Sequence, residues 1–101
     1  MQGLKIHEVI SLTTSREFLR QSIEPVNITN IKGSTRYNGI RVLDYIFRQL
    51  QQEFSRIKGV ILNVDDDHAA LFTAIKLGYK NINYTGKSKE AISILNNIKR
   101  I

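Results

Sequence analysis

The chain has 101 residues, 42% of them hydrophobic and 24% charged, which predicts one small globular domain over residues 1–101 and excludes a disordered chain. It contains no cysteine, which excludes disulfides, zinc–thiolate centres and thiol nucleophiles. The net charge of +6 favours anionic partners such as nucleotide phosphates.

The chain carries no signal for a membrane or for export. No apolar run reaches the roughly 18–20 residues that span a bilayer. The N-terminal stretch MQGLKIHEVISL has neither a basic leader nor a small-residue cleavage site. We therefore expect a cytoplasmic protein that does not enter a membrane.

Strand-like and helix-like patterns alternate along the chain. In order, they predict a strand at 4–12, a short helix capped by Thr14 or Ser15 and stopped by Pro25, a strand at 26–31, a loop at 32–39, a helix at 40–56, a strand at 59–64, a helix at 67–77 closed by Gly78, a strand at 79–84 and a last helix at 88–100 capped by Ser88. This order predicts an α/β domain, with α+β as the variant, built on a single mixed sheet of about four strands flanked by helices.

The helix at 40–56 has the clearest pattern. Ile40, Leu43, Phe47, Leu50 and Phe54 recur at steps of three and four residues, which is typical of a half-buried amphipathic helix. The run GVILNV that follows is almost continuously apolar, and it favours a central strand covered on both faces.

Three aspartates and a histidine, Asp65 to His68, follow that strand. Carboxylate oxygens are ligands for hard cations, but adjacent residues point in different directions. An aspartate before a helix also accepts a hydrogen bond from a free backbone amide, and acids near this end favour the helix dipole. We therefore predict that Asp67 caps a helix and that the cluster holds no metal.

The stretch TGKS at 85–88 ends like a phosphate-binding P-loop. That motif requires a glycine where Asn81 stands. We therefore predict a turn with a helix cap at this place and reject ATP binding through a P-loop.

A second candidate for phosphate binding is the loop that leads into the helix at 40–56. Its residues are Arg36, Tyr37, Asn38, Gly39, Ile40 and Arg41. A glycine turn before a helix presents free backbone amides to a pyrophosphate, and the two arginines add positive charge. The alternative is that the loop binds no ligand and contains a glycine only because the turn from strand to helix requires one.

In their order and spacing, these segments resemble the cofactor-binding half of the GNAT family of N-acetyltransferases, over roughly residues 26–84. Arg36-x-x-Gly39-Ile40 matches the family's pyrophosphate loop, and the helix at 40–56 and the strand GVILNV match its next elements. The family's following motif is Asn-x-x-Ala-x-x-Leu-Tyr-x-Lys-x-Gly-Phe, and Asp67, Ala70, Lys76, Gly78 and Tyr79 fall at its Asn, Ala, Lys, Gly and Phe positions without a gap. The resemblance implies that the loop from Arg36 to Arg41, together with Asp67, binds acetyl-CoA.

The chain differs from the family at the position of the catalytic tyrosine and in the pyrophosphate loop. The tyrosine that protonates the leaving thiolate in the family falls on Ala74, and Arg41 replaces a small residue of the loop. The part before residue 26 is too short for the family's usual first strand and two helices. The resemblance therefore implies a small domain that binds a CoA-type anion, either as a weak N-acyltransferase or as one that has lost this activity, and it assigns no catalytic residue.

Two other α/β families share parts of the pattern. The segment VILNVDDDHAAL is similar to the acidic pocket of a response-regulator receiver, but residues 79–101 are too few for the strands that a receiver still needs. STAS-like domains are similar in length, although their phosphorylated turn falls on residues 36–39, which contain no serine. That resemblance implies a non-enzymatic module that acts through a protein partner or as a homodimer.

Nucleic-acid binding is the third alternative, and we do not expect it. Lys87, Lys89, Lys99 and Arg100 lie near the two ends of the last helix, and no aromatic residue lies within it. Stacking of bases requires aromatic side chains.

Overall fold

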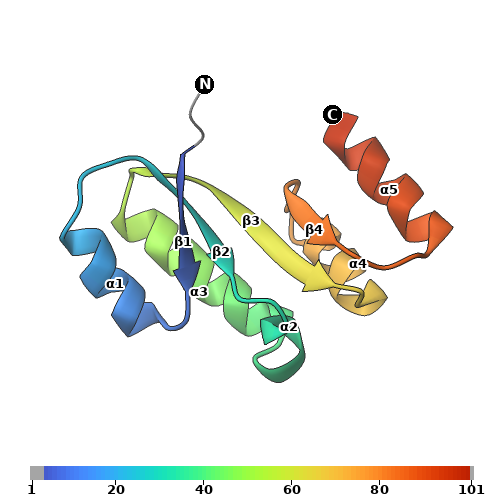
Figure 1. Ribbon diagram of the computed structural model, residues 1–101, viewed down its shortest axis with the longest axis horizontal. Coiled ribbons are helices and arrows are strands. Elements are labelled where there is room, and N and C mark those ends of the chain that lie inside the picture. Colours follow the sequence, from blue (N-terminus) through green and yellow to red (C-terminus); the bar gives the residue numbers. More distant parts are fainter. Residues whose placement is uncertain (1–3, 101) are drawn as a thin grey trace.

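Four parallel strands form the sheet of the protein, whose computed structural model describes residues 4–100, with side chains for residues 4–98 (Figure 1). The strands are β1 (Lys5–Val9), β2 (Val26–Asn30), β3 (Ile57–Asp65) and β4 (Ile82–Tyr84). They lie side by side in chain order, and every pairing is parallel. The predicted α/β class and the number of strands are confirmed. The sheet is parallel rather than mixed because a helix in each connection returns the chain to the same edge.

The helices form a second layer. They are α1 (Leu12–Arg20), α2 (Ser34–Tyr37), α3 (Ile40–Glu53), α4 (His68–Lys76) and α5 (Lys89–Arg100). With right-handed crossovers, a sheet ordered in this way carries its helices on one face. Figure 1 shows α3 and α4 behind the strands and α5 beside β4. The shortest dimension of the molecule is 19 Å, which fits two layers. No helix within residues 4–100 is long and apolar enough to cross a membrane.

One hydrophobic core joins the sheet to the helices. Its strand residues are Val9, Val26, Ile28, Ile57, Leu62, Val64 and Ile82, and its helix residues are Leu19, Leu43, Phe47, Leu50, Ala70, Leu71, Ala74, Ala91 and Leu95. The predicted stripe of α3 is confirmed, because Leu43, Phe47 and Leu50 are almost fully buried. Ile40 and Phe54 lie at its margins and are only partly buried.

The other face of the sheet has no helix over it in Figure 1. It carries Ile6, which is 57% exposed, as well as Asn27, Ile61 and Asn83. The prediction that β3 is covered on both faces is therefore wrong. A short apolar run is compatible with a strand that has helices on both faces. It is equally compatible with a strand like β3, whose open face carries Ile61 and Asn63.

Helix α1 begins earlier than predicted because Ser11 caps it, with its Oγ accepting a hydrogen bond from the Thr14 amide at 3.2 Å. The predicted caps Thr14 and Ser15 lie inside the helix. Ser15 is fully buried, and its Oγ lies 2.9 Å from Nε2 of His7. The His7 ring also stacks on Phe18, with centroids 4.2 Å apart, and burial lowers the pKa of His7.

The predicted caps in the second half of the chain are confirmed. Asp67 accepts a hydrogen bond from the Ala70 amide at 3.1 Å, and Ser88 accepts one from the Ala91 amide at 3.2 Å. Gly78 follows α4 with a φ of 97°, a conformation that favours glycine. The strand predicted from residue 79 begins only at Ile82. The side chains of Lys99 and Arg100 lie outside the described residues.

Candidate functional site

The segments that follow β2, β3 and β4 meet at the carboxyl edge of the sheet, toward the bottom of the view in Figure 1. Ligand sites of parallel α/β proteins usually lie at this edge. Here the strand order never reverses, so the sheet opens no crevice of its own. Side chains and amides of the segments at this edge must therefore form any site, and both the predicted loop at 36–41 and the three aspartates lie there.

Each of the three aspartates contacts a different segment. Oδ2 of Asp65 accepts a hydrogen bond from the Gly33 amide at 2.8 Å, Asp66 forms an ion pair with Arg36, and Asp67 caps α4. The carboxylates therefore diverge. Among the described residues, no three histidine or acidic side chains are placed to hold a metal ion.

Asp65 has an unusual backbone. Its φ of 53° lies in the left-handed region, which costs a non-glycine residue energy and which aspartate tolerates better than most. In this conformation its carbonyl accepts a hydrogen bond from the Thr85 amide at 2.8 Å. Asp65 thereby connects the end of β3 both to the segment before α2 and to the segment after β4.

The predicted loop at 32–39 contains a short helix, α2, between two glycines with positive φ, Gly33 at 86° and Gly39 at 84°. The prediction of an irregular loop is wrong over residues 34–37. Tyr37 is 69% exposed, and Asn38 is exposed as well. Arg36 reaches across to Asp66, so the structure brings the predicted loop and the aspartate cluster together.

Helix α3 starts at this loop with its first amides uncovered. No side chain in the described part of the chain caps it, and no acid lies in its first turn. The Leu43 amide bonds to the Gly39 carbonyl, which leaves the amides of Ile40, Arg41 and Val42 without partners within the helix. Arg41 is exposed at this end.

The position that corresponds to the family's catalytic tyrosine is unsuited to catalysis. Ala74 is 0% exposed and packs in the core between α4 and the sheet. A side chain at this position faces the core and not the carboxyl edge.

Sequence reasoning missed a buried asparagine that organises the carboxyl edge. Asn30 is 0% exposed, and its amide bonds to both backbone groups of Asn63, the N–H at 2.8 Å and the carbonyl at 2.9 Å. Its Nδ2 also donates to Oγ of Ser34 at 2.8 Å. The Asn30 side chain thus takes the place of a backbone hydrogen-bonding partner for Asn63 between β2 and β3. Through Ser34 it also holds the start of α2. The sequence did contain one signal. Val26 and Ile28 alternate as the buried residues of their strand, and Asn30 is the next position on the same face.

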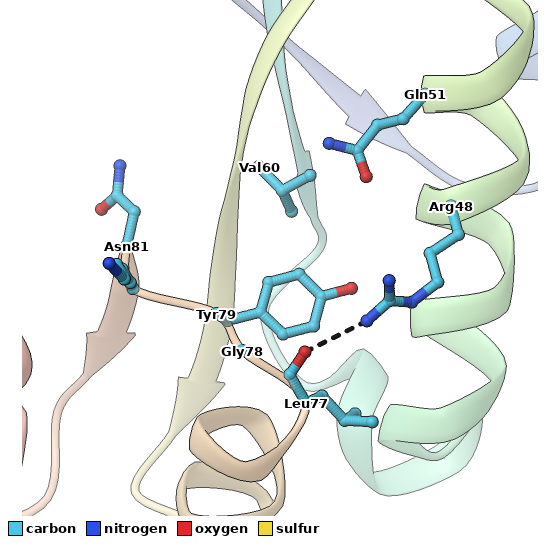
Figure 2. A pocket seen from close by; sticks show the side chains of 8 residues that line it. Arg48, Gln51, Val60, Leu77, Gly78, Tyr79 and Asn81 are labelled. Carbon is cyan, nitrogen blue, oxygen red and sulfur yellow. Dashed lines mark hydrogen bonds between the residues drawn. The ribbon is translucent and has the colours of Figure 1, made fainter.

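A cavity of about 350 Å³ lies on the helix side, at the other end of the sheet (Figure 2). Figure 2 shows the Tyr79 ring between Val60 and the side chains of Arg48 and Gln51. The Tyr79 hydroxyl donates to Asp44 at 2.5 Å, and Nε of Arg48 contacts both Asp44 oxygens at 2.9 and 3.0 Å. Arg48 also donates to the Leu77 carbonyl at 3.1 Å. This cluster joins α3 to the segment between α4 and β4.

Burial raises the pKa of Tyr79, and the hydrogen bond to Asp44 raises it further. Tyr79→Phe is expected to lower the free energy of unfolding by about 1–2 kcal/mol at neutral pH, because the hydrogen bond to a carboxylate is lost. A pKa that is higher in the folded state gives stability that is present below pH of about 10 and is lost as the pH rises further. Urea unfolding at pH 7 and above pH 10 measures both effects.

The control for this prediction is Tyr45→Phe on α3, the helix that carries Asp44. Tyr45 is 58% exposed, so its variant is expected to stay within about 0.5 kcal/mol of wild type at pH 7. Equal stability of the Tyr79→Phe variant and wild type at pH 7 would show that the contact with Asp44 contributes nothing.

The comparisons with known proteins give one relative. No family model and no solved structure matches the chain. "Uncharacterized protein RP547" of Rickettsia prowazekii (strain Madrid E) is 44% identical over 95 residues, which cover 93% of this chain and 90% of that protein. With this identity over nearly the full length of both proteins, the chain belongs to the same protein family as RP547.

Proposed function

We propose that the chain binds a CoA-type anion, such as acetyl-CoA, with the pyrophosphate at the N-terminus of α3. The observation that carries the proposal is the uncapped start of this helix, which is 14 residues long and has no acid in its first turn. Its free amides and the positive end of its dipole suit a phosphate group. Gly39, with its φ of 84° and no atom within 4 Å of the place of a Cβ, lets a ligand approach these amides closely.

The charges around this helix end support the same ligand. Arg41 is exposed within the first turn, and Lys32 is exposed before α2. Arg36 is paired with Asp66 on the surface, and exposed pairs of this kind are worth only about 0–1 kcal/mol. A pyrophosphate can therefore replace Asp66 as the partner of the Arg36 guanidinium at little cost in free energy.

The proposal is for binding without acyl transfer. The position that corresponds to the family's general acid is the buried Ala74, and general acid–base catalysis usually contributes about 10²–10⁴-fold to a rate. Because the position of the family's general acid lies in the core, our proposal does not extend to acyl transfer.

A protein-interaction module of the STAS-like kind is the second candidate. The uncovered sheet face and the exposed Ile6 and Ile10, at 57% and 68%, favour a protein partner or a homodimer. In that case CoA should have no effect on the protein.

Titration with CoA tests the proposal. Calorimetry and thermal unfolding of the wild type should show binding and a melting temperature that rises with CoA concentration. Arg41→Gln is expected to weaken binding by about tenfold, the effect of one charge-assisted hydrogen bond. Lys76→Gln removes the same charge from the far end of α4 and should leave the affinity unchanged. Absence of binding at millimolar CoA would refute the proposal and leave the interaction module.

A further inference from the structure

The two outer edges of the sheet differ. At one edge β4 has only three residues, pairs irregularly with β3 and lies beside α5 (Figure 1). At the other edge β1 pairs with β2 over all five of its residues without a bulge, and no described strand lies on its outer side. Natural proteins usually protect such an edge with a bulge, a proline or an unpaired charge. β1 has no proline, and its Lys5 forms an ion pair with Glu24 at 2.8 Å.

The backbone of β2 bonds alternately to its two neighbours, as in any parallel sheet. The Val26 amide donates to the carbonyl of the residue just before β3 at 3.1 Å. The Asn30 carbonyl accepts a hydrogen bond from a side chain of β3 at 2.7 Å. Val26 and Asn30 therefore face β3, and by alternation Asn27 and Thr29 face β1.

These directions determine which backbone groups of β1 are free. Asn27 is paired in register with Ile6, and Thr29 is paired with Glu8. Of two paired residues in a parallel ladder, only one bonds to the opposite strand. Because Asn27 and Thr29 are the ones that bond, Ile6 and Glu8 turn their N–H and C=O groups away from β2. The outer edge of β1 thus presents two donors and two acceptors that no described strand uses.

Exposed apolar side chains flank this edge on both faces of the sheet. Ile6 lies on the open face, and Leu4 and Ile10 are exposed just before and just after β1. On the helix side, Phe18 is exposed and its ring stacks on His7. Apolar surface that gathers in one place in this way is typical of an interaction site.

We propose that this edge pairs with the same edge of a second copy of the chain, with the two β1 strands antiparallel. A two-fold axis normal to the sheet relates the copies, joins their sheets into one and puts both sets of helices on the same face. The free backbone groups of Ile6 and Glu8 then bond to those of the second copy. The inference goes beyond the proposed function and does not depend on CoA binding, because it uses no residue of the loop at 36–41.

The charges on β1 suit a second copy. With this axis, each possible register is centred on one residue, which faces its own copy. Registers centred on Lys5 or on Glu8 set like charges opposite each other, which is unfavourable. Registers centred on Ile6 or on His7 avoid this and keep most of the strand paired. In the first register Ile6 faces Ile6 of the second copy, and in the second register Ile6 faces Glu8.

Sedimentation equilibrium of the full chain tests the proposal. Wild type is expected to be a dimer at about 0.1 mM and to dissociate on dilution. In Ile6→Glu the new carboxylate faces its own copy in one register and Glu8 in the other, so this variant should weaken the dimer about a hundredfold or more. Ile6 is exposed, so circular dichroism should show an unchanged fold. Ile92→Glu is the matched control, because Ile92 is exposed on α5 beside the opposite edge, and it should stay dimeric.

Cross-linking identifies the register. The chain contains no cysteine, so a single introduced cysteine can form a disulfide only with a second copy. Facing Cα atoms of antiparallel strands lie about 5.5 or 4.5 Å apart, within the roughly 4.4–6.8 Å that a disulfide spans. Ile6→Cys should cross-link on oxidation if the register is centred on Ile6, and His7→Cys if it is centred on His7. Ile92→Cys measures the cross-linking caused by random collision.

Three results would overturn the proposal. The first is a wild-type chain that stays monomeric at the concentration tested, which would leave the edge to a different protein. The second is a dimer that Ile6→Glu does not weaken. The third is a dimer in which neither Ile6→Cys nor His7→Cys cross-links more than Ile92→Cys does. The last two would place the interface elsewhere on the molecule.

Discussion

Asn30→Ala is expected to lower the free energy of unfolding by about 3–4 kcal/mol, since each buried polar group left unsatisfied costs about 1–3 kcal/mol. The side chain is fully buried and bonds to the amide and the carbonyl of Asn63 and to Ser34. Alanine leaves both backbone groups of Asn63 without partners and a small cavity behind. Urea unfolding followed by circular dichroism measures the loss.

Two variants control this prediction. Asn27→Ala lies in the same strand, on the open face, and should change stability by no more than about 0.5 kcal/mol. Asn30→Asp keeps the shape and the acceptor for the Asn63 amide but removes the donor for the Asn63 carbonyl and Ser34, so it should also destabilise. A loss below about 1 kcal/mol for Asn30→Ala would mean that water replaces the side chain and that Asn30 does not hold β3 to β2.

The features that were correctly predicted depend on residues close together in the sequence. The buried stripe of α3 follows from the spacing of Leu43, Phe47 and Leu50 along one helix. The caps at Asp67 and Ser88 each involve an amide three residues later. Patterns within one or two helical turns contain this information.

The features that were missed depend on contacts between distant residues. Asn30 bonds to Asn63, and Tyr79 bonds to Asp44, and no local pattern identifies such partners. Tyr79 was predicted to begin a strand because its segment alternates, but its hydroxyl bonds to α3 and β4 starts at Ile82. Parallel strand direction is likewise set by the helical crossovers rather than by residues within the strands.

The candidate site combines both kinds of information. The loop at 36–41 was identified from its glycine and arginines, and its contact with the aspartate cluster, through Arg36 and Asp66, became visible only in the structure. The ligand assigned to this loop stays a prediction.

Gly39→Ala is expected to weaken CoA binding by about tenfold or more and to cost about 1–3 kcal/mol of stability. Gly39 has a φ of 84° and a ψ of 144°, a conformation that residues with a Cβ adopt only under strain. A Cβ would meet no atom within 4 Å, so the cost comes from the backbone and not from a clash. Relief of that strain shifts the chain at the start of α3 and moves the amides of its first turn away from the pyrophosphate.

Gly78→Ala is the matched control for this prediction. Gly78 has a φ of 97° and equally open surroundings, but it follows α4 at the opposite end of the helix layer from the proposed site. Its variant should lose a comparable amount of stability and bind CoA as wild type does, since only the backbone strain is shared. Calorimetric titration of both variants with CoA, alongside urea unfolding, separates strain from binding. If Gly39→Ala and Gly78→Ala bind CoA equally well, the start of α3 does not hold the pyrophosphate.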